Sequence, residues 1–474
     1  MTKELHKHSI IELIKGYKEK TFSPLEVAEE IIKKINSQNK KLNAFVHFDE
    51  EYVLQQATSS NAKYDSNQTR GDLEGVPISI KDLIVTNHMP TNRGSLTSSL
   101  SVNSDFDAPV VKKLKQNGAI ILGKTASPEF GHKGTTQSLK HGTTNNPWNI
   151  SLNTGGSSGG SCAAVAAGLG PASIGTDGGG SIRIPCGFCG LFGHKPTFGK
   201  IPAYPISPFG TIANLGPITR TVKDSGIIMN SIATPDLQDW HSLPEERIDY
   251  TLYEGDLIKN FKVGFSQFWG MEKYFNQSLM EEEILLKIEE TISVLSRHGL
   301  QIKERNFIEW PHNPLEIFMV MWQAGAANLA RKINKNDFDK MEPSFLNFIE
   351  KGNQYSMFDL MDAEAKRAEN AMHMKKVFSE IDALIGPTLP VLPFNTDNNV
   401  PKGFPDDDLF SWLPFTYPFN LTKNPACNVN ANFSNSGLPI GIQIVADIYK
   451  DKTCYELAFF LEQVMKLTDK WPNL

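Results

Sequence analysis

The feature that most constrains this chain is a pair of glycine- and serine-rich clusters, at residues 153–161 and 175–183. By composition alone, such stretches are as typical of flexible loops as of ordered functional loops. Here, however, the first cluster runs directly into small apolar residues at 163–167, which would let a helix pack closely against a sheet. A short apolar stretch then leads to the second cluster. We therefore expect two ordered loops, each held over buried elements, in an α/β fold.

The second cluster has the composition of a site for acyl transfer. Gly178, Gly179 and Gly180 precede Ser181, and glycines leave backbone N–H groups unshielded by any Cβ atom. Such N–H groups beside a serine hydroxyl can stabilise the oxyanion that forms when a carbonyl carbon is attacked.

Two other interpretations of the first cluster are weaker. Residues 155–159 match G-x-S-x-G, the nucleophile elbow of α/β-hydrolases, but the residues before them do not form the buried apolar strand that an elbow requires. A phosphate-binding loop would need a lysine directly after its final glycine, and the sequence has none there.

A serine nucleophile needs a base, and the sequence offers two kinds of candidate. His132, His141 and His194 flank the glycine-rich region, but their spacing identifies no catalytic triad. Lys81 stands within the apolar run of residues 75–85, where a lysine either extends to solvent from a strand end or is buried. Burial would lower its pKa from about 10.4 towards about 7–8, so that the neutral amine could accept a proton.

The remaining sequence alternates helical and strand patterns. Ser23-Pro24-Leu25-Glu26 has the form of a capping box, and apolar residues at 27, 31 and 35 follow it on one helical face. The patterns also predict a helix followed by a strand in residues 107–123, a helix over 281–297, and a strand over 438–445 before a closing helix.

This alternation predicts one domain over residues 1–474, because the chain shows no clean linker and no internal repeat. We expect a large mixed, mostly parallel central sheet, flanked by helices on both faces. Residues 1–70 would form an N-terminal helical segment, residues 71–220 the catalytic core, and residues 310–380 a peripheral helical segment.

Composition excludes several classes of function. The net charge of −6 gives no basic surplus for binding nucleic acid. Neither a signal peptide nor a run of about 18 uncharged apolar residues is present, so we expect a cytoplasmic protein without a membrane partner. Five cysteines are too few for a disulfide scaffold, and the pair Cys186 and Cys189 lacks the second half of a zinc site. We expect neither a metal nor an organic cofactor.

Taken together, the glycine-rich segments resemble the amidase signature family of serine hydrolases. The resemblance rests on the sequences GVPISIKD, GGSSGGS, GTDGGGSIRIP, FCGLFGHKPTFG and GPITRTVKD, with weaker matches in TYPFNLTKNPA and GLPIGIQIV. It spans the chain from about residue 10 to the end. The resemblance implies an amidase that cleaves a C–N bond through an acyl-serine intermediate and uses no cofactor.

The resemblance also implies a Ser–Ser–Lys triad. Ser181 would be the nucleophile, Lys81 the base, and Ser157 the bridging serine, which in this family follows a cis peptide bond. The N–H groups of residues 178–181 would bind the oxyanion, and Gly131 would line the acyl pocket.

Asp177 and Arg183 are expected to orient the loop rather than to react. A carboxylate close to the lysine would favour its protonated form and so oppose its use as a base.

Within this family, the chain could be a stand-alone amidase or the A subunit of a glutamine-dependent tRNA amidotransferase. That subunit usually has a polar residue where Ile184-Pro185 stands, and a tyrosine–glycine pattern in place of residues 200–205. We therefore expect a stand-alone amidase, a monomer or homodimer, that acts on a small-molecule amide. An inactive binding protein is disfavoured, because all three triad positions hold the expected residues.

The substrate class stays open among aliphatic amides, aryl acylamides, carbamates and cyclic amides. The apolar segment Trp412-Leu413-Pro414-Phe415 could shape a pocket or belong to the core.

Overall fold

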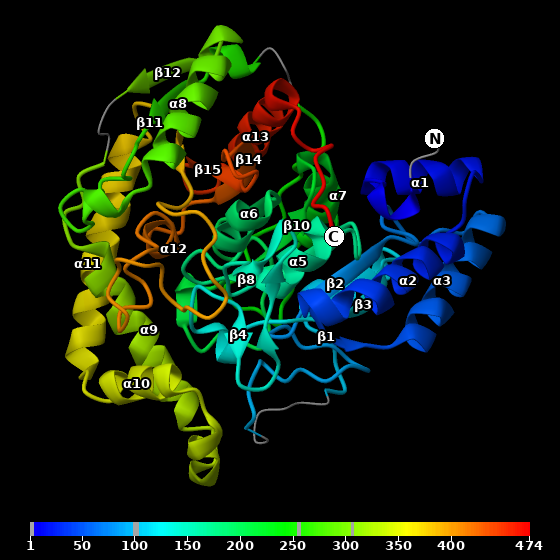
Figure 1. The fold of residues 1–474 in the computed structure, drawn as a ribbon, viewed down its shortest axis with the longest axis horizontal. Helices are drawn as coiled ribbons and strands as arrows, with labels where there is room; N and C mark the ends of the chain where they lie inside the picture. The colour runs from blue at the N-terminus through cyan, green and yellow to red at the C-terminus, as the bar shows by residue number, and fades with distance from the viewer. Residues whose placement is uncertain (1–3, 98–103, 254–256, 305–307) are drawn as a thin grey trace.

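The computed structural model describes residues 4–97, 104–253, 257–304 and 308–474. Its centre is an eleven-stranded sheet that runs across the molecule (Figure 1). In spatial order, its strands are β1 (Phe45–Phe48), β3 (Ile120–Thr125), β2 (Pro77–Lys81), β8 (Ala172–Asp177), β10 (Asn214–Thr219), β9 (Phe192–Lys195), β14 (Ala426–Phe433), β15 (Pro439–Ala446), β13 (Ala383–Pro387), β11 (Lys262–Phe265) and β12 (Gln301–Glu304). Two short pairs lie outside it: β4 (Gln137–Ser138) with β5 (Gly142–Thr143), and β6 (Asn145–Asn146) with β7 (Asn149–Asn153).

The sheet is large and mixed, as predicted for an α/β fold. Strands β3, β2 and β8 form one parallel run, and β13, β11 and β12 form another. The other six neighbouring pairs in the described sheet are antiparallel, so its parallel share is smaller than we expected. The reason lies in the connections, because helices link the parallel strands whereas a tight turn joins β14 to β15.

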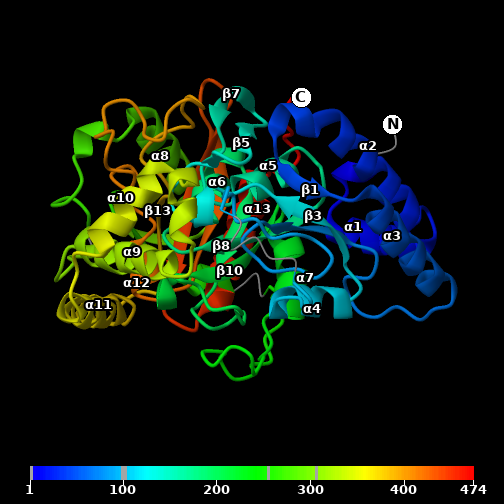
Figure 2. The ribbon, with the colours of Figure 1, turned by 90° about the horizontal axis from the view of Figure 1, so that it is seen from below.

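Helices cover both faces of the sheet. Figure 2 shows α5 and α6 above the central strands, with α4 and α7 below them. The helices are α1 (Ile10–Glu19), α2 (Pro24–Leu42), α3 (Glu50–Asp65), α4 (Pro109–Gln116), α5 (Gly159–Ala166), α6 (Arg183–Cys189), α7 (Val222–Ile232), α8 (Glu282–Arg297), α9 (Pro314–Ala330), α10 (Pro343–Gly352), α11 (Met357–Val377), α12 (Pro418–Leu421) and α13 (Asp451–Met465). Within the described ranges, no helix combines the length and the apolar character needed to span a bilayer.

The local sequence signals are confirmed. At the start of α2, Ser23 Oγ accepts a hydrogen bond from Glu26 N, and the Glu26 carboxylate accepts one from Ser23 N. The residues at 27, 31 and 35 form the buried face of this helix. The predicted helix–strand pair is α4 and β3, the predicted helix over 281–297 is α8, and the late strand and closing helix are β15 and α13.

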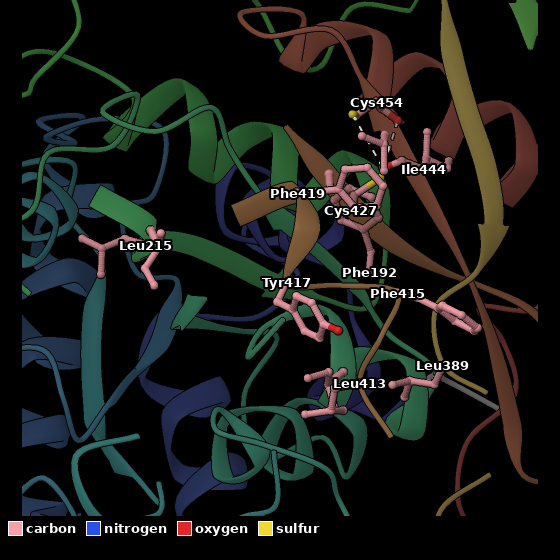
Figure 3. Packing of buried hydrophobic residues seen from close by; sticks show 14 of the residues in the cluster. Phe192, Leu215, Leu389, Leu413, Phe415, Tyr417, Phe419, Cys427, Ile444 and Cys454 are labelled. Atoms are coloured by element: carbon pink, nitrogen blue, oxygen red, sulfur yellow. Dashed lines mark hydrogen bonds between the residues drawn. The ribbon is translucent and has the colours of Figure 1, made fainter. Parts of the chain in front are cut away.

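Apolar side chains from the segment around α12 fill the core beside β14 and β15. Figure 3 shows Phe415 and Tyr417 of this segment in the same cluster as Cys427 and Ile444 from those strands. Trp412 is fully buried and stacks on Phe188 of α6, with ring centroids 6.0 Å apart. Trp412 and Phe415 therefore belong to the core.

Candidate active site

Ser181 lies in the loop that joins β8 to α6, and a buried carboxylate at the end of β8 fixes the shape of this loop. One carboxylate oxygen of Asp177 accepts a hydrogen bond from Gly180 N at 2.7 Å. The other accepts one from Ile182 N at 3.2 Å. The carboxylate therefore holds the backbone on both sides of Ser181.

Arg183, the first residue of α6, holds that carboxylate in turn. Its guanidinium donates to both oxygens of Asp177, at 2.9 and 3.0 Å, and both side chains are fully buried. Burial alone would raise the pKa of Asp177, but the charge and hydrogen bonds of Arg183 keep it well below its ordinary value. The prediction that these two residues orient the loop agrees with this geometry.

Distant segments complete the support of the loop. Arg183 Nη1 donates to Gln443 Oε1 on β15, and Asn420 Nδ2 of α12 donates to Asp177 Oδ1. Thr416 Oγ1 donates to the carbonyl of Gly179 at 2.7 Å. Three residues from the last part of the chain thus bind the loop that carries Ser181.

The three glycines before Ser181 lie where there is no room for a side chain. A Cβ atom on Gly178 would lie 2.8 Å from the Trp322 ring, and one on Gly179 would lie 2.8 Å from the Phe318 ring. Gly180 has a φ of 124°, in a region that L-residues with side chains rarely adopt. Close approach of α9 therefore requires glycine here, in addition to any need for open N–H groups.

Lys81, the last residue of β2, is fully buried and contacts three hydroxyl groups. Its Nζ lies 2.7 Å from Ser157 Oγ, 2.9 Å from Ser158 Oγ and 2.8 Å from Thr176 Oγ1. Burial lowers the pKa of Lys81 to about 7, against the opposing attraction of Asp177. The Gly156–Ser157 peptide bond is cis, as the resemblance implies.

A pocket of about 160 Å³ brings both candidate serines together. Ser157, Ser181, Gly131 and Gly178 all line it, and Lys81 reaches it through Ser157. Its other walls are mainly apolar, from Leu83, Ile84, Val85, Phe130, Phe209, Leu215, Trp322 and Leu329. Arg93 is the one charged side chain among the described lining residues.

The three histidines considered as bases lie outside this lining. His132 Nε2 lies 2.8 Å from Ser344 Oγ, and His194 Nε2 lies 3.1 Å from Asp451 Oδ1. Burial lowers the pKa values of His132 and His141 to about 4. Of the candidate bases, only Lys81 contacts a serine of the pocket.

Sequence reasoning missed several residues of the site. Ser158 and Thr176 contact Lys81 as closely as Ser157 does, and their one sequence signal is that each adjoins a residue already singled out. The wall formed by residues 203–215 and by Trp322 of α9 carried no signal, because these segments are distant in sequence.

The described part of the chain presents no group of three His, Cys, Asp or Glu side chains placed to hold a metal ion. Cys186 instead lies 3.7 Å from Cys162, sulfur to sulfur, and all five cysteines are buried and unpaired.

Comparison with known proteins identifies the family. The family model described as Amidase matches residues 26–455. The chain belongs to the amidase family.

Among individual relatives, an acylamidase from Rhodococcus erythropolis is 32% identical over 99% of this chain and 98% of its own length. The A subunit of a glutamyl-tRNA(Gln) amidotransferase from Alkaliphilus metalliredigens is 31% identical over 99% of both chains. A solved bacterial aryl acylamidase of the amidase signature enzymes superposes with a TM-score of 0.88 and 27% identity, covering 99% of this chain and all of that one.

Proposed function

We propose that this protein is a stand-alone amidase that hydrolyses uncharged carboxylic amides through an acyl intermediate on Ser181. The observation that carries the proposal is the buried contact between Lys81 Nζ and Ser157 Oγ, at the edge of a pocket that Ser181 also lines. In this proposal, Lys81 is the base and Ser157 carries the proton between Lys81 and Ser181.

The hydrogen-bond partners available to the two N–H groups and the lone pair of neutral Lys81 support this direction of proton transfer. Ser158 Oγ donates to the carbonyl of Thr176 at 3.1 Å, so its lone pairs receive an N–H of Lys81. A second N–H of the neutral amine goes to Thr176 Oγ1. The lone pair of Nζ is then left to accept the hydroxyl hydrogen of Ser157.

The reaction proceeds in two balanced halves. Ser181 Oγ attacks the carbonyl carbon, its proton passes to Ser157 Oγ, and the proton of Ser157 passes to Lys81 Nζ. The proton returns by the same path to the leaving nitrogen, the C–N bond breaks, and ammonia or an amine departs. Water then attacks the acyl-serine, giving up its proton along this path, and the carboxylic acid leaves as Ser181 regains its hydrogen. No step requires a cofactor.

The donors proposed for the oxyanion are fewer than the sequence suggests. Gly180 N is already bonded to the Asp177 carboxylate, so it is withdrawn from the expected set. The N–H groups of Gly178, Gly179 and Ser181 stay in the proposal. A loop fixed in advance by Asp177 suits this role, because preorganised donors need no rearrangement during the reaction.

The pocket favours an uncharged substrate. A glutamine molecule carries an ammonium group, which needs a carboxylate partner, and the described lining contains no Asp or Glu side chain. The apolar walls instead suit an alkyl or aryl group, and the acylamidase relative supports this class. The nearly equal identity to an amidotransferase chain, 31% against 32% for the acylamidase, makes glutamine-dependent transamidation the second candidate.

A fluorophosphonate probe tests the nucleophile, and an amide panel tests the class. The wild-type protein should be labelled and should hydrolyse aryl or alkyl amides, whereas Ser181→Ala should do neither. Absence of labelling in the wild type would refute the acyl-serine. Hydrolysis of glutamine, but of no simple amide, would favour the second candidate function, glutamine-dependent transamidation.

A further inference from the structure

The pocket wall beside Ser157 is tightly constrained. Phe130 and Gly131 form this wall, and a Cβ atom on Gly131 would lie 2.7 Å from Leu83 Cδ1 and 3.2 Å from Ser157 Oγ. Phe130 has a φ of 50°, which bulky residues rarely adopt. Such a conformation persists only where the surroundings hold it.

Buried polar groups on both sides of this wall meet at one residue, Glu342, which precedes α10. Before the wall, Glu129 Oε2 accepts a hydrogen bond from Glu342 N at 2.7 Å, and Glu129 Oε1 accepts one from Ser95 Oγ at 2.6 Å. After the wall, Lys133 Nζ donates to Glu342 Oε2 at 2.7 Å. Glu129, Lys133 and Glu342 are each at most 4% exposed.

His132 adds a second connection from the wall to the helices. Its Nδ1 lies 2.7 Å from the carbonyl of Glu129, which can only accept, so Nδ1 carries the hydrogen and Nε2 accepts from Ser344 Oγ of α10. The carbonyl of His132 accepts from Trp322 Nε1 at 3.2 Å, and the Trp322 ring lines the pocket. Helices α9 and α10 thus support two sides of one pocket.

We propose that Glu342 is a positioning residue, which holds the Phe130–Gly131 wall through Lys133 and thereby limits the length of the acyl group that fits beside Ser157. This inference rests on the proposed function. Glu342 lies outside the pocket lining, so its carboxylate acts through Lys133 rather than by touching the substrate. The bond to Glu129 comes from the backbone N–H of Glu342 and does not depend on the side chain. Without its carboxylate, the buried ammonium of Lys133 has lost the counter-ion that it is hydrogen-bonded to, and we expect Lys133 and the wall to shift together.

The test is Glu342→Gln, which keeps the shape of the side chain but removes its charge. Acetanilide and its hexanoyl homologue are compared by kcat and KM, and a short-chain and a long-chain fluorophosphonate are compared by labelling rate. We expect the long-to-short ratio of kcat/KM to rise about tenfold, which is the selectivity that one methylene can carry in an apolar pocket. The change should lie mainly in KM, and the pH midpoint of kcat/KM should not move, because Lys81 is untouched.

Glu74→Gln is the matched control. Glu74 is also a fully buried carboxylate with a cationic partner, Arg70, but it lies outside the pocket lining. The long-to-short ratio of kcat/KM in Glu74→Gln should match that of the wild type. An equal shift in Glu74→Gln would mean that any loss of rigidity changes selectivity, and it would overturn the specific role of Glu342.

Two further variants keep the test decisive if Glu342→Gln does not fold. Replacing both members of the pair, as Lys133→Met with Glu342→Leu, leaves no unpaired charge in the interior. Ser344→Ala removes only the bond to His132. The double variant should raise the long-to-short ratio, and an unchanged ratio in the folded double variant overturns the inference. Ser344→Ala keeps the pair of Lys133 and Glu342 and should raise the ratio less, so an equal rise in Ser344→Ala would also overturn the specific role of Glu342. A wild-type protein that neither hydrolyses amides nor reacts with either probe would refute the proposed function instead.

Discussion

Two buried lysines on neighbouring parallel strands differ in what they can do. Lys81 on β2 and Lys124 on β3 are both fully buried, and burial lowers the pKa of each to about 7. Lys124 Nζ donates to the carbonyl of Ile84 and contacts the hydroxyls of Thr86 and Thr91. All three of its partners belong to the segment that follows β2, which Lys124 therefore fastens to β3.

Lys81 contacts three hydroxyl groups and, at 3.5 Å, the carbonyl of Thr176, and two of the residues that supply these hydroxyls, Ser157 and Thr176, line the pocket. A carbonyl oxygen can only accept a hydrogen bond, whereas a hydroxyl can also donate one to a neutral amine. Burial therefore makes both lysines easy to deprotonate. Only a hydroxyl partner that faces the pocket gives the neutral amine a route to a substrate.

The largest expected effect is a difference in rate between Lys81→Met and Lys124→Met. Loss of Lys81, the proposed base, should lower kcat by about 10²–10⁴-fold, which is the usual contribution of general acid–base catalysis. Lys124→Met should retain most of the turnover, because its side chain contacts neither serine of the pocket. Steady-state kinetics on the two folded proteins measure this, and similar losses would contradict the distinction.

The pH dependence of the rate gives the next largest effect. As Lys81 gains a proton below its pKa of about 7, kcat/KM should fall about tenfold per pH unit, and it should level off above that pKa. Lys124→Met should show the same profile. A profile that moves in Lys124→Met, or a wild-type rate that does not change with pH, would mean that another group is the base.

Removing one hydroxyl group beside each lysine should produce a smaller difference in kcat between the two sites. Ser158→Ala deprives Lys81 of one acceptor, which costs about 1.4 kcal/mol, or about tenfold in kcat. Thr91→Val removes a corresponding hydroxyl beside Lys124 and should leave kcat unchanged. Stopped assays at saturating substrate distinguish these outcomes, and equal kcat values for the two variants would show that Ser158 does not position Lys81.

The two lysines should resemble each other in their effect on stability. Each has a folded-state pKa of about 7 against an ordinary value of 10.5, so between these values the unfolded chain binds more protons. The free energy of unfolding should therefore rise with pH in this window, by about 1.4 kcal/mol per pH unit for each lysine. Urea unfolding at several pH values measures the slope. Lys81→Met and Lys124→Met should each reduce it by that amount, and an unchanged slope would show that the lysine is not neutral when folded.

Local features of the fold were predictable because neighbouring residues determine them. The capping box at Ser23 and Glu26, the helix over 281–297 and the strand over 438–445 all follow from patterns a few residues long. The order of the strands does not, because β10 inserts between β8 and β9 through contacts that no local pattern contains.

The candidate site was predictable to the same extent. Lys81 stood out as a charge in an apolar run, and the glycines before Ser181 stood out by composition. Thr176 was missed as a partner of Lys81 because only the pairing of β2 with β8 brings the two together. The sequence also could not show that Trp322 and Phe318 of α9 leave no space at Gly178 and Gly179.

The support of Asp177 and Arg183 by Asn420 and Gln443 has a consequence for biosynthesis. A growing chain that has not yet released β15 from the ribosome lacks the groups that fix the backbone around Ser181. Proteolytic fragments that end before α12 lack them as well. The backbone around Ser181 therefore reaches its final support only after the chain has been synthesised and folded through β15.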